Sequence, residues 1–344
     1  MSMASEELPP ATLRGRPGLH MSRDLVLALF TLALFAVVTL VFPQFAQPRN
    51  VAEILDDSAI LILLALGQML VILTRGIDLS VAANLALSGM VAALCNRAWP
   101  DASVTTFILV AIAAGTALGA CNGLLVWKLR LPPIVVTLGT MSIYRGIIYL
   151  ISGGTWVNDN EMSRDFLGFV RTGVLGLSTL SWLAIIGTVV AALSLRYTVT
   201  GRNFHAAGGN PGAAAYVGIE PGWMQFMAYT ICGGVAGLCG YLWVARFAVA
   251  YTDIALGFEL QVIAACLIGG VAIAGGVGTA LGVVLGCLFI GVIRNALPLL
   301  GISPFWQMSI NGLVIIVAAV LGVRQRTERR AILEQKRMTE AGNS

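Results

Sequence analysis

Residues 200–222 read TGRNFHAAGGNPGAAAYVGIEPG, the longest polar, Gly- and Ala-rich break between apolar runs in the second half of the chain. Asn210 can cap a short helix with its side-chain oxygen, and Pro211 suits the first helical position, which needs no N–H. Three alanines then favour helix, and Gly218 can end it with a positive φ. The pattern predicts a short surface helix between two membrane spans. It is typical of a plug offered to another protein, but a helical loop that merely joins two spans has the same features.

The composition predicts an all-α polytopic membrane protein. The chain has 344 residues, of which 58% are hydrophobic and 11% charged, with a mean hydropathy of +0.86. Soluble domains carry about 25% charged residues. A span needs about 20 apolar residues, so this length holds roughly ten spans with short loops. The net charge of +4 does not indicate nucleic-acid binding, because the basic residues lie between spans and in a tail.

Charge-poor runs divide the chain into two tails and one membrane domain. The tails are residues 1–23 and 324–344, and the membrane domain is 24–323. Residues 260–293 carry no charge and are too long for one span, and their glycines predict a tight hairpin inside them. The predicted spans are 24–42, 55–74, 79–96, 104–127, 133–152, 175–196, 223–245, 259–274, 278–297 and 304–323.

The distribution of positive charge predicts the orientation. With ten alternating spans and the N-terminus inside, most of the 21 Lys and Arg residues fall in cytoplasmic loops and tails. Both termini and the 200–222 loop are then cytoplasmic. The main outer loop, 153–174, is either solvated or part of a docking surface for an external partner.

A nine-residue echo predicts an inverted repeat. GTALGACNG at 115–123 recurs as GTALGVVLG at 278–286, with six of nine positions identical. The copies fall in spans four and nine, which cross in opposite directions, as inverted repeats of transporters do. Glycines four apart let a second helix backbone approach closely, although short Gly-rich matches also arise by chance. The glycines predicted to pack helices are Gly115, Gly119, Gly123, Gly278, Gly282 and Gly286.

Polar residues inside spans are candidates for a translocation path, because polar groups are costly in hydrocarbon. A lipid-facing Arg145 is disfavoured, since it lies about three turns into its span. For the amides, hydrogen bonding between helices is the alternative. Asp78 is predicted to cap the start of span three. The candidates for the path are Gln68, Asn122, Thr137, Thr140, Arg145 and Asn295.

The sequence shows neither a catalytic set nor a source of energy. It has no GxxxxGK[ST] phosphate loop, no nucleophile–His–acid set and no metal-ligand cluster. The six cysteines resemble small buried hydrophobes. Asp253 and Glu259 lie at the predicted outer edge, and not at the midplane where ion-coupling acids are expected. We expect a permease driven by a separate ATPase. A stand-alone facilitator or secondary carrier is the alternative.

Four stretches resemble the permease subunits of bacterial ABC importers for monosaccharides, the ribose/xylose/galactose/rhamnose permease family. They are ILTRGIDLSVAANLALSG (72–89), LPPIVVTLGTMSIYRG (131–146), GRNFHAAGGNPGAAAYVGI (201–219) and AACLIGGVAIAGGVGTALG (264–282). SGGTWVN (152–158), YLWVARFAVAYTDIALGFEL (241–260) and NALPLLGISPF (295–305) look most like rhamnose permeases. Ribose, xylose or a furanosyl signal are alternative cargoes.

The resemblance implies an ABC permease fold in the bacterial inner membrane and a set of partners. These are a second permease subunit, a cytoplasmic ATPase that binds ATP and Mg²⁺, and a periplasmic sugar-binding protein. The second permease subunit is either another copy of this chain or a related chain, and the rhamnose-like group often pairs two different permeases, which favours a heterodimer. This chain would need no cofactor of its own, and transport would proceed by alternating access. Carried over by position, the residues of the ATPase-coupling element are Gly209, Asn210, Ala213, Ala214, Ala215 and Gly218, and Ala214→Glu is expected to abolish uptake.

Overall fold

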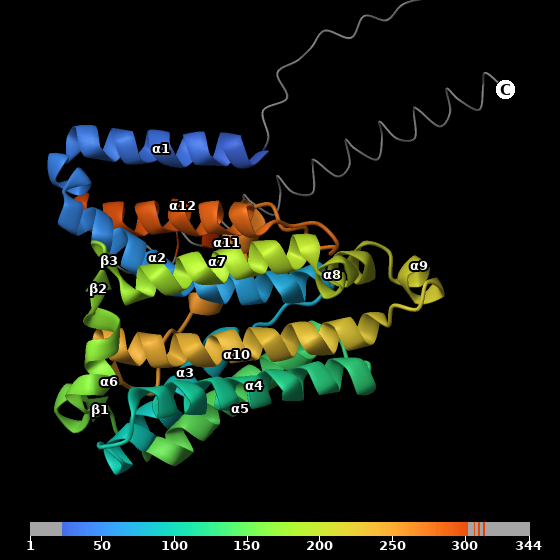
Figure 1. Cartoon of the computed structure of the whole chain (residues 1–344), viewed down its shortest axis with the longest axis horizontal. Coiled ribbons are helices and arrows are strands. Elements are labelled where there is room, and N and C mark those ends of the chain that lie inside the picture. The colour runs from blue at the N-terminus through green and yellow to red at the C-terminus, as the bar shows by residue number, and fades with distance from the viewer. Residues whose placement is uncertain (1–22, 302–305, 307–308, 310–311, 314–344) are drawn as a thin grey trace, which may run out of the picture.

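The computed structural model describes residues 23–301, 306, 309, 312 and 313. Its long helices lie roughly side by side along one direction (Figure 1). Among the described helices, eight are long and apolar enough to cross a membrane, which confirms the predicted all-α membrane fold. They are α1 (Arg23–Val41), α2 (Pro48–Leu73), α3 (Val81–Ala98), α4 (Val104–Lys128), α5 (Pro133–Ser152), α7 (Thr179–Tyr197), α10 (Pro221–Phe247) and α12 (Ala280–Leu299).

Each of these helices coincides with a predicted span, but the predicted span at 259–274 differs. Helix α11 covers only Phe258–Ile268, and its 11 residues rise roughly 16 Å, about half of a hydrocarbon core of about 30 Å. The predicted span at 304–323 lies mostly outside the described residues. The same holds for nearly all of the tail at 1–23 and for the whole tail at 324–344.

The two ends of the bundle carry different structures. At the α9 end, α9 (Pro211–Tyr216) projects beyond the long helices, and α8 (Val199–Gly209) connects α7 to it (Figure 1). At the opposite end, the α6 end, β1 pairs antiparallel with β4, and β2 pairs with β3. The predicted outer loop is therefore a folded cap, in which Phe166 is fully buried. The short elements of this end are η1 (Pro43–Ala46), β1 (Val157–Asn158), η2 (Asp159–Glu161), α6 (Arg164–Gly168), η3 (Phe169–Arg171), β2 (Gly173–Val174), β3 (Leu177–Ser178) and β4 (Val249–Ala250).

Segment 248–279 crosses the bundle as irregular backbone followed by α11. Near its start, Ala250 pairs with Val157 at the α6 end. Near its end, the backbone N–H of Gly276 donates to the carbonyl of Leu73 at the α9 end, 2.9 Å away. Gly276 has a φ of +77°, so the predicted glycine hairpin is present between α11 and α12.

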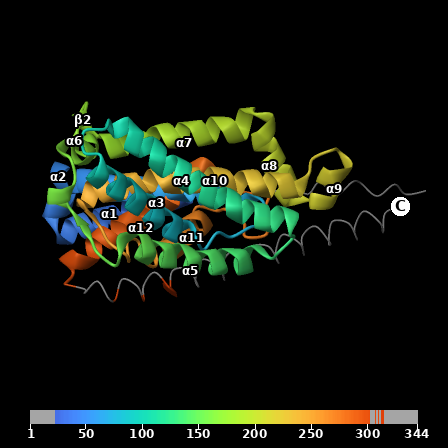
Figure 2. The same cartoon turned by 90° about the horizontal axis from the view of Figure 1, so that it is seen from below.

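The centre of the bundle is formed by α2, α3 and α10. Helices α2 and α3 are mostly buried, and α10 packs against α2, α3 and α4. Helices α1 and α5 leave wide apolar faces exposed, and Figure 2 shows α5 along one side of the molecule. Faces of this kind fit lipid or another subunit.

The glycine stripe of α4 lies directly against the backbone of α10. A Cβ added at Gly115 or Gly119 would come 2.3 Å from a carbonyl oxygen of α10, and one at Gly123 would come 2.9 Å from another. Real Cβ atoms do not approach so closely. The two helices therefore touch backbone to backbone along this stripe.

The second stripe lies against α11. A Cβ at Gly282 or Gly286 would come 2.2 Å from a carbonyl oxygen of α11 or of the residue that ends it. Gly278 precedes α12, and a Cβ there would lie 3.2 Å from the side chain of Val271. The two stripes thus pack against different helices.

The packing of α4 and α12 supports the inverted repeat. Helix α4 packs on α3 and α10, and α12 packs on the corresponding helices α11 and α2. Helix α4 ends at the α9 end, where Trp127 contacts Glu220, and α12 begins there, so the two run in opposite directions. The structure also reveals a second echo. GIDLSVAA (76–83) ends in the first turn of α3 and GFELQVIA (257–264) covers the start of α11, and the two share Gly, Leu, Val and Ala.

Candidate functional site

Helix α8 is fixed to the bundle by the end of α2. The hydroxyl of Thr198 accepts the N–H of Gly201 at 3.0 Å and so begins the helix. Arg75, just after α2, donates to the carbonyl of Gly208 at 2.6 Å and to that of Gly209 at 2.9 Å. A Cβ at Gly208 would overlap the last carbonyl oxygen of α2, so only glycine permits this approach.

Sequence reasoning misses α8, because its glycines lower the helix propensity of the segment. The available signal is Thr198, a favourable N-cap residue after the last residue of α7. His205 of α8 also contacts the bundle. It is half-buried, and its Nδ1 lies 3.1 Å from the carbonyl oxygen of Gly276.

Helix α9 forms as the sequence predicts. The side-chain oxygen of Asn210 accepts the N–H of Ala213 at 3.1 Å, Pro211 occupies the first position, and Gly218 follows with a φ of +83°. Asn210 also links α8 to α9 without a gap, since α8 ends at Gly209.

The exposure of α9 differs from what the coupling hypothesis assumed. Ala213 and Ala215 are exposed, but Ala214 is only 4% exposed and packs inward. The most prominent side chains are Tyr216, 94% exposed, and Val217, 74% exposed. The surface that α9 offers is therefore centred on Tyr216, and Ala214 holds the helix in place.

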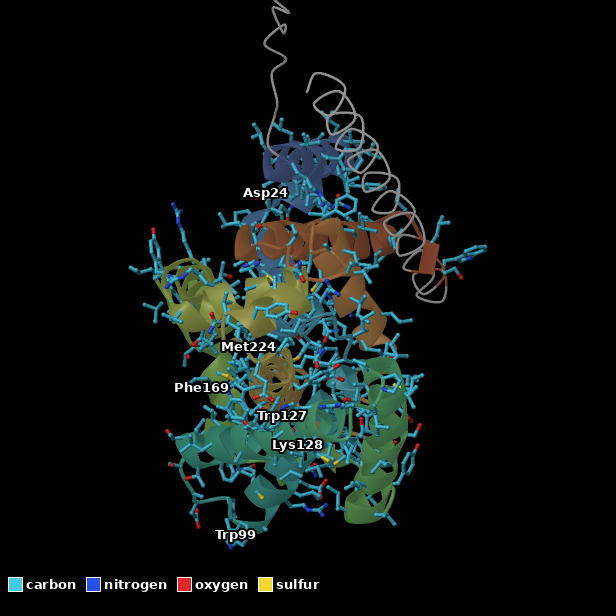
Figure 3. The ribbon with its side chains drawn as sticks, turned by 90° about the vertical axis from the view of Figure 1, so that its right-hand side faces the viewer. Asp24, Trp99, Trp127, Lys128, Phe169 and Met224 are labelled. Atoms are coloured by element: carbon cyan, nitrogen blue, oxygen red, sulfur yellow. The ribbon has the colours of Figure 1, made fainter. Side chains whose placement is uncertain are left out.

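The segment after α9 is tied to the end of α4. Trp127 donates from its indole nitrogen to the carboxylate of Glu220 at 2.7 Å. The Lys128 ammonium lies 3.6 Å from the centroid of the Trp127 ring, and both residues are labelled in Figure 3, which looks onto the α9 end. Trp127 also packs against Trp223 in the first turn of α10. The α8–α9 segment is thus anchored on both sides, through Arg75 at the end of α8 and through Glu220 after α9.

A buried polar network surrounds the segment that leads into α3. Asp78 accepts from the backbone N–H of Ser80 at 2.8 Å and from its hydroxyl at 2.6 Å. The sequence predicts that Asp78 caps an N–H within the helix. In the structure it instead fixes Ser80, the residue before α3. Asn122 donates to the Ser80 hydroxyl at 2.7 Å, and the Tyr144 hydroxyl lies 3.3 Å from the Asn122 side-chain oxygen.

The carbonyl of Ile77 is a second centre of this network. The hydroxyl of Thr137 donates to it at 3.2 Å and that of Tyr229 at 3.3 Å. Two of the predicted path residues, Asn122 and Thr137, are thus fully buried and join helices to irregular backbone.

The other predicted path residues do not meet at one place. Thr140 donates to the Val136 carbonyl of its own helix at 3.1 Å, and Asn295 to Gly291 of its own helix at 3.0 Å. Gln68 is fully buried in α2, and its amide nitrogen has no hydrogen-bond partner among the described residues.

Arg145 differs from these residues because it contacts the irregular crossing segment. Its guanidinium donates to the carbonyls of Thr252 at 3.2 Å and Ile254 at 2.7 Å. The carboxylates of Glu259 and Asp253 lie near enough for their charges to act on it. Among the described residues, neither carboxylate forms an ion pair within 4.0 Å of Arg145.

Glu259 is a candidate that the sequence analysis set aside. It was placed at an outer edge, but it is half-buried in the first turn of α11. The echo at 257–264 gives the missed signal, since Glu259 there stands where Asp78 stands in the first repeat.

At the α6 end, Arg246 ties three helices together. It forms ion pairs with Asp56 at 3.4 Å and with Asp57, and Ser178 and Ser181 donate to Asp56. The carboxylates belong to α2, the arginine to α10 and the serines to the start of α7. A cavity of about 330 Å³ opens beside this cluster.

The cap of the α6 end is held by Glu161. Its carboxylate accepts the N–H of Asn158 at 3.0 Å and pairs with Arg97 at 3.3 Å. The hydrogen bond from Asn158, together with Arg97, lowers the pKa of Glu161. The carboxylate therefore stays charged at neutral pH.

Within the described part of the chain, no three His, Cys, Asp or Glu side chains gather as a metal site would require. All six cysteines are free thiols, and four of them are buried, which fits a packing role for those four.

Comparison with known proteins gives one family. The family described as branched-chain amino acid transport system / permease component matches residues 50–319. An autoinducer 2 import system permease protein of Enterobacter sp. (strain 638) is 37% identical over 89% of this chain and 88% of its own length. An L-arabinose ABC transporter permease protein of Azospirillum brasilense is 34% identical over 94% of each chain. A ribose import permease protein of Escherichia coli (strain K12) is 36% identical over 84% of this chain and 90% of its own. No solved structure matches the chain.

Proposed function

The chain belongs to the branched-chain amino acid transport system / permease component family, and on this premise we propose that it carries a monosaccharide for an ATP-driven importer. Family membership makes it a polytopic inner-membrane permease subunit that is not itself an enzyme. The identity of the cargo, the coupling to an ATPase and the route through the chain are the parts that we propose.

The proposed cargo is a sugar or a furanosyl compound of similar size. The relatives named above import ribose, L-arabinose or autoinducer 2 by their names, at 34–37% identity to this chain. Because these identities are nearly equal, none singles out one cargo. The rhamnose-like stretches at 152–158, 241–260 and 295–305 make L-rhamnose the first compound to test, with ribose, arabinose and xylose beside it.

The observation that carries the coupling proposal is the form of the α8–α9 segment. Helix α9 is capped and projects from the bundle, with Tyr216 and Val217 exposed, while α8 is bound to the end of α2 through Arg75 and Gly208. Movement of an ATPase bound to α9 would therefore be transmitted to α8, to α2 through Arg75, and to the turn before α12 through His205. The α9 end would face the cytoplasm, as the positive-charge distribution predicts.

The proposed route for the sugar runs along the exposed face of α5 and past Arg145. Open space surrounds Gly139 and Gly146, and a second permease subunit facing this side would close a path. Arg145, Asp253 and Glu259 supply the donors and acceptors that sugar hydroxyls require. The network around Asp78 instead holds the helices together.

The mechanism that follows is alternating access. ATP binding closes the ATPase pair, α9 transmits the movement, and the path opens at the α6 end to a periplasmic sugar-binding protein. The folded cap of that end, held by Glu161, Arg97 and Asn158, is the proposed docking surface. Hydrolysis then returns the path to the cytoplasmic side.

The test is uptake of labelled rhamnose, ribose, arabinose and xylose in cells that carry the intact transporter genes, with this gene deleted and restored. Loss of one sugar on deletion, with recovery on complementation, would identify the cargo. Uptake that continues unchanged for every sugar would contradict the proposed cargo class.

A further inference from the structure

An apolar cavity of about 340 Å³ lies beside α7 towards the α9 end. Its walls come from α2, α7 and α10 and include Leu66, Ala191 and Val235, respectively. Phe204 of α8 closes the cavity on the side of the α8–α9 segment. Gly187 contributes no side chain to the α7 wall. The cavity is therefore an intramembrane groove, and the first turns of the proposed coupling segment form its floor.

Two arginines are the chain neighbours of residues that line this floor, because Arg196 follows Leu195 and Arg202 follows Gly201. Arg202 in α8 donates to the carbonyl of Tyr197 at 3.4 Å, and the Arg196 guanidinium lies 5.4 Å from the centroid of the Tyr197 ring. Both arginines are exposed, and among the described residues neither has an acidic partner within 4.0 Å. Two exposed arginines, without an acidic partner among the described residues, thus adjoin residues that line an apolar groove.

We propose that this groove holds one acyl chain of an anionic phospholipid, whose phosphate lies against Arg196 and Arg202. The apolar walls lie among membrane-spanning helices, where a lipid tail is the available apolar molecule. The arginines match a negative headgroup, and anionic lipids are attracted to basic residues at the cytoplasmic surface. Charge complementarity and the apolar lining therefore point to the same occupant.

The position of the groove gives this lipid a mechanical role. Its floor includes Thr198 and Gly201, where α7 passes into α8. A bound acyl chain braces this joint, so the lipid would stiffen the link between α7 and α9. Lipid composition would then change how firmly ATPase movement reaches the bundle.

The test is native mass spectrometry of the purified full-length chain with added phosphatidylglycerol or phosphatidylcholine of identical acyl chains. The unaltered protein should retain one phosphatidylglycerol and favour it over phosphatidylcholine by roughly tenfold, because each basic residue near the headgroup adds attraction. Ala191→Phe fills the groove from α7, and Val235→Phe fills it from α10. Both should lose the retained lipid.

Val189→Phe is the matched control, since Val189 is exposed on α7 and does not line the groove. It should retain phosphatidylglycerol. The double variant Arg196→Gln/Arg202→Gln should bind both lipids equally. Unchanged lipid retention in Ala191→Phe and Val235→Phe would overturn the proposal, as would equal binding of the two lipids by the unaltered protein. Loss of a dimer in place of a lipid would assign the groove to a second copy instead.

Discussion

At the scale of single residues, Asn122 and Asn295 show how the structure separates amides that the sequence could not. Asn122 is fully buried and joins α4 to Ser80 and Tyr144, whereas among the described residues Asn295 donates to its own helix and is partly exposed. Both are asparagines inside apolar helices, so the sequence pattern is the same. Asn122 is assigned a role in helix packing because its hydrogen-bond partners, Ser80 and Tyr144, lie outside its own helix.

We therefore expect Asn122→Ala to destabilise the chain by about 1 kcal/mol or more, because two buried partners lose a hydrogen bond. Asn295→Ala is the matched control and should change stability little. The measurement is thermal unfolding in detergent, together with KM for sugar uptake below the unfolding temperature. A raised KM with unchanged stability would instead place Asn122 in contact with the cargo.

Arg145 and Glu259 are the residues that the proposed sugar route depends on. We expect Arg145→Gln and Glu259→Gln each to raise KM for uptake several-fold, because each removes hydrogen-bonding groups that face the path. Their matched controls are Arg49→Gln and Glu53→Gln, an exposed i,i+4 pair that contributes little. Wild-type KM values in both path variants would remove Arg145 and Glu259 from the route.

At the scale of elements, α9 is where the structure changes the experiment that the sequence suggested. Ala214→Glu would bury a charge inside the segment, so it would disrupt α9 whether or not an ATPase binds there. Val217→Glu changes an exposed position instead. We expect it to abolish sugar-dependent ATP hydrolysis and co-purification of the ATPase, while the permease stays inserted.

Val199→Glu is the control for this variant. Val199 is exposed at 63% in the first turn of α8, against 74% for Val217, and it lies away from the α9 surface. It should retain the ATPase. If Val217→Glu also retains it with normal uptake, the coupling role of α9 is wrong.

The contact between α4 and α10 can be tested with glycines that differ only in their surroundings. A Cβ at Gly119 would meet a carbonyl oxygen of α10 at 2.3 Å, whereas one at Gly146 on α5 would have no neighbour within 4 Å. We expect Gly119→Ala to cost roughly 1–3 kcal/mol through overpacking and Gly146→Ala to leave the folding of the single chain intact. Equal unfolding temperatures for the two variants would contradict this contact.

Much of the element structure was predictable, because apolar run length and cap residues act locally. The eight long helices and the capped helix at 211–216 follow from such signals. Helix α8 and the shortened α11 do not, since their glycines are tolerated only through tertiary contacts such as that of Gly208 with the end of α2. The contacts of Arg145 and the partial burial of Glu259 depend on the path of residues 248–257 through the bundle, which no local sequence pattern fixes.

At the scale of the whole molecule, the inverted repeat gives the bundle two interrupted crossings. Residues 74–80 before α3 and residues 248–257 before α11 are both non-helical, and the two segments start from opposite ends of the bundle. Irregular backbone at membrane depth is tolerated where protein surrounds it, and Thr137, Tyr229 and Arg145 satisfy its carbonyls. These crossings are natural places for the two halves of the bundle to shift against each other.

The central claim is that this permease moves a sugar only when an ATPase drives it through α9. The most direct measurement is labelled-sugar uptake into proteoliposomes that contain the chain with its permease partner, with and without the ATPase subunit, the sugar-binding protein and ATP. The account predicts uptake with all components present and none when the ATPase or ATP is omitted. Equal uptake by the permease alone would contradict the account and identify a facilitator.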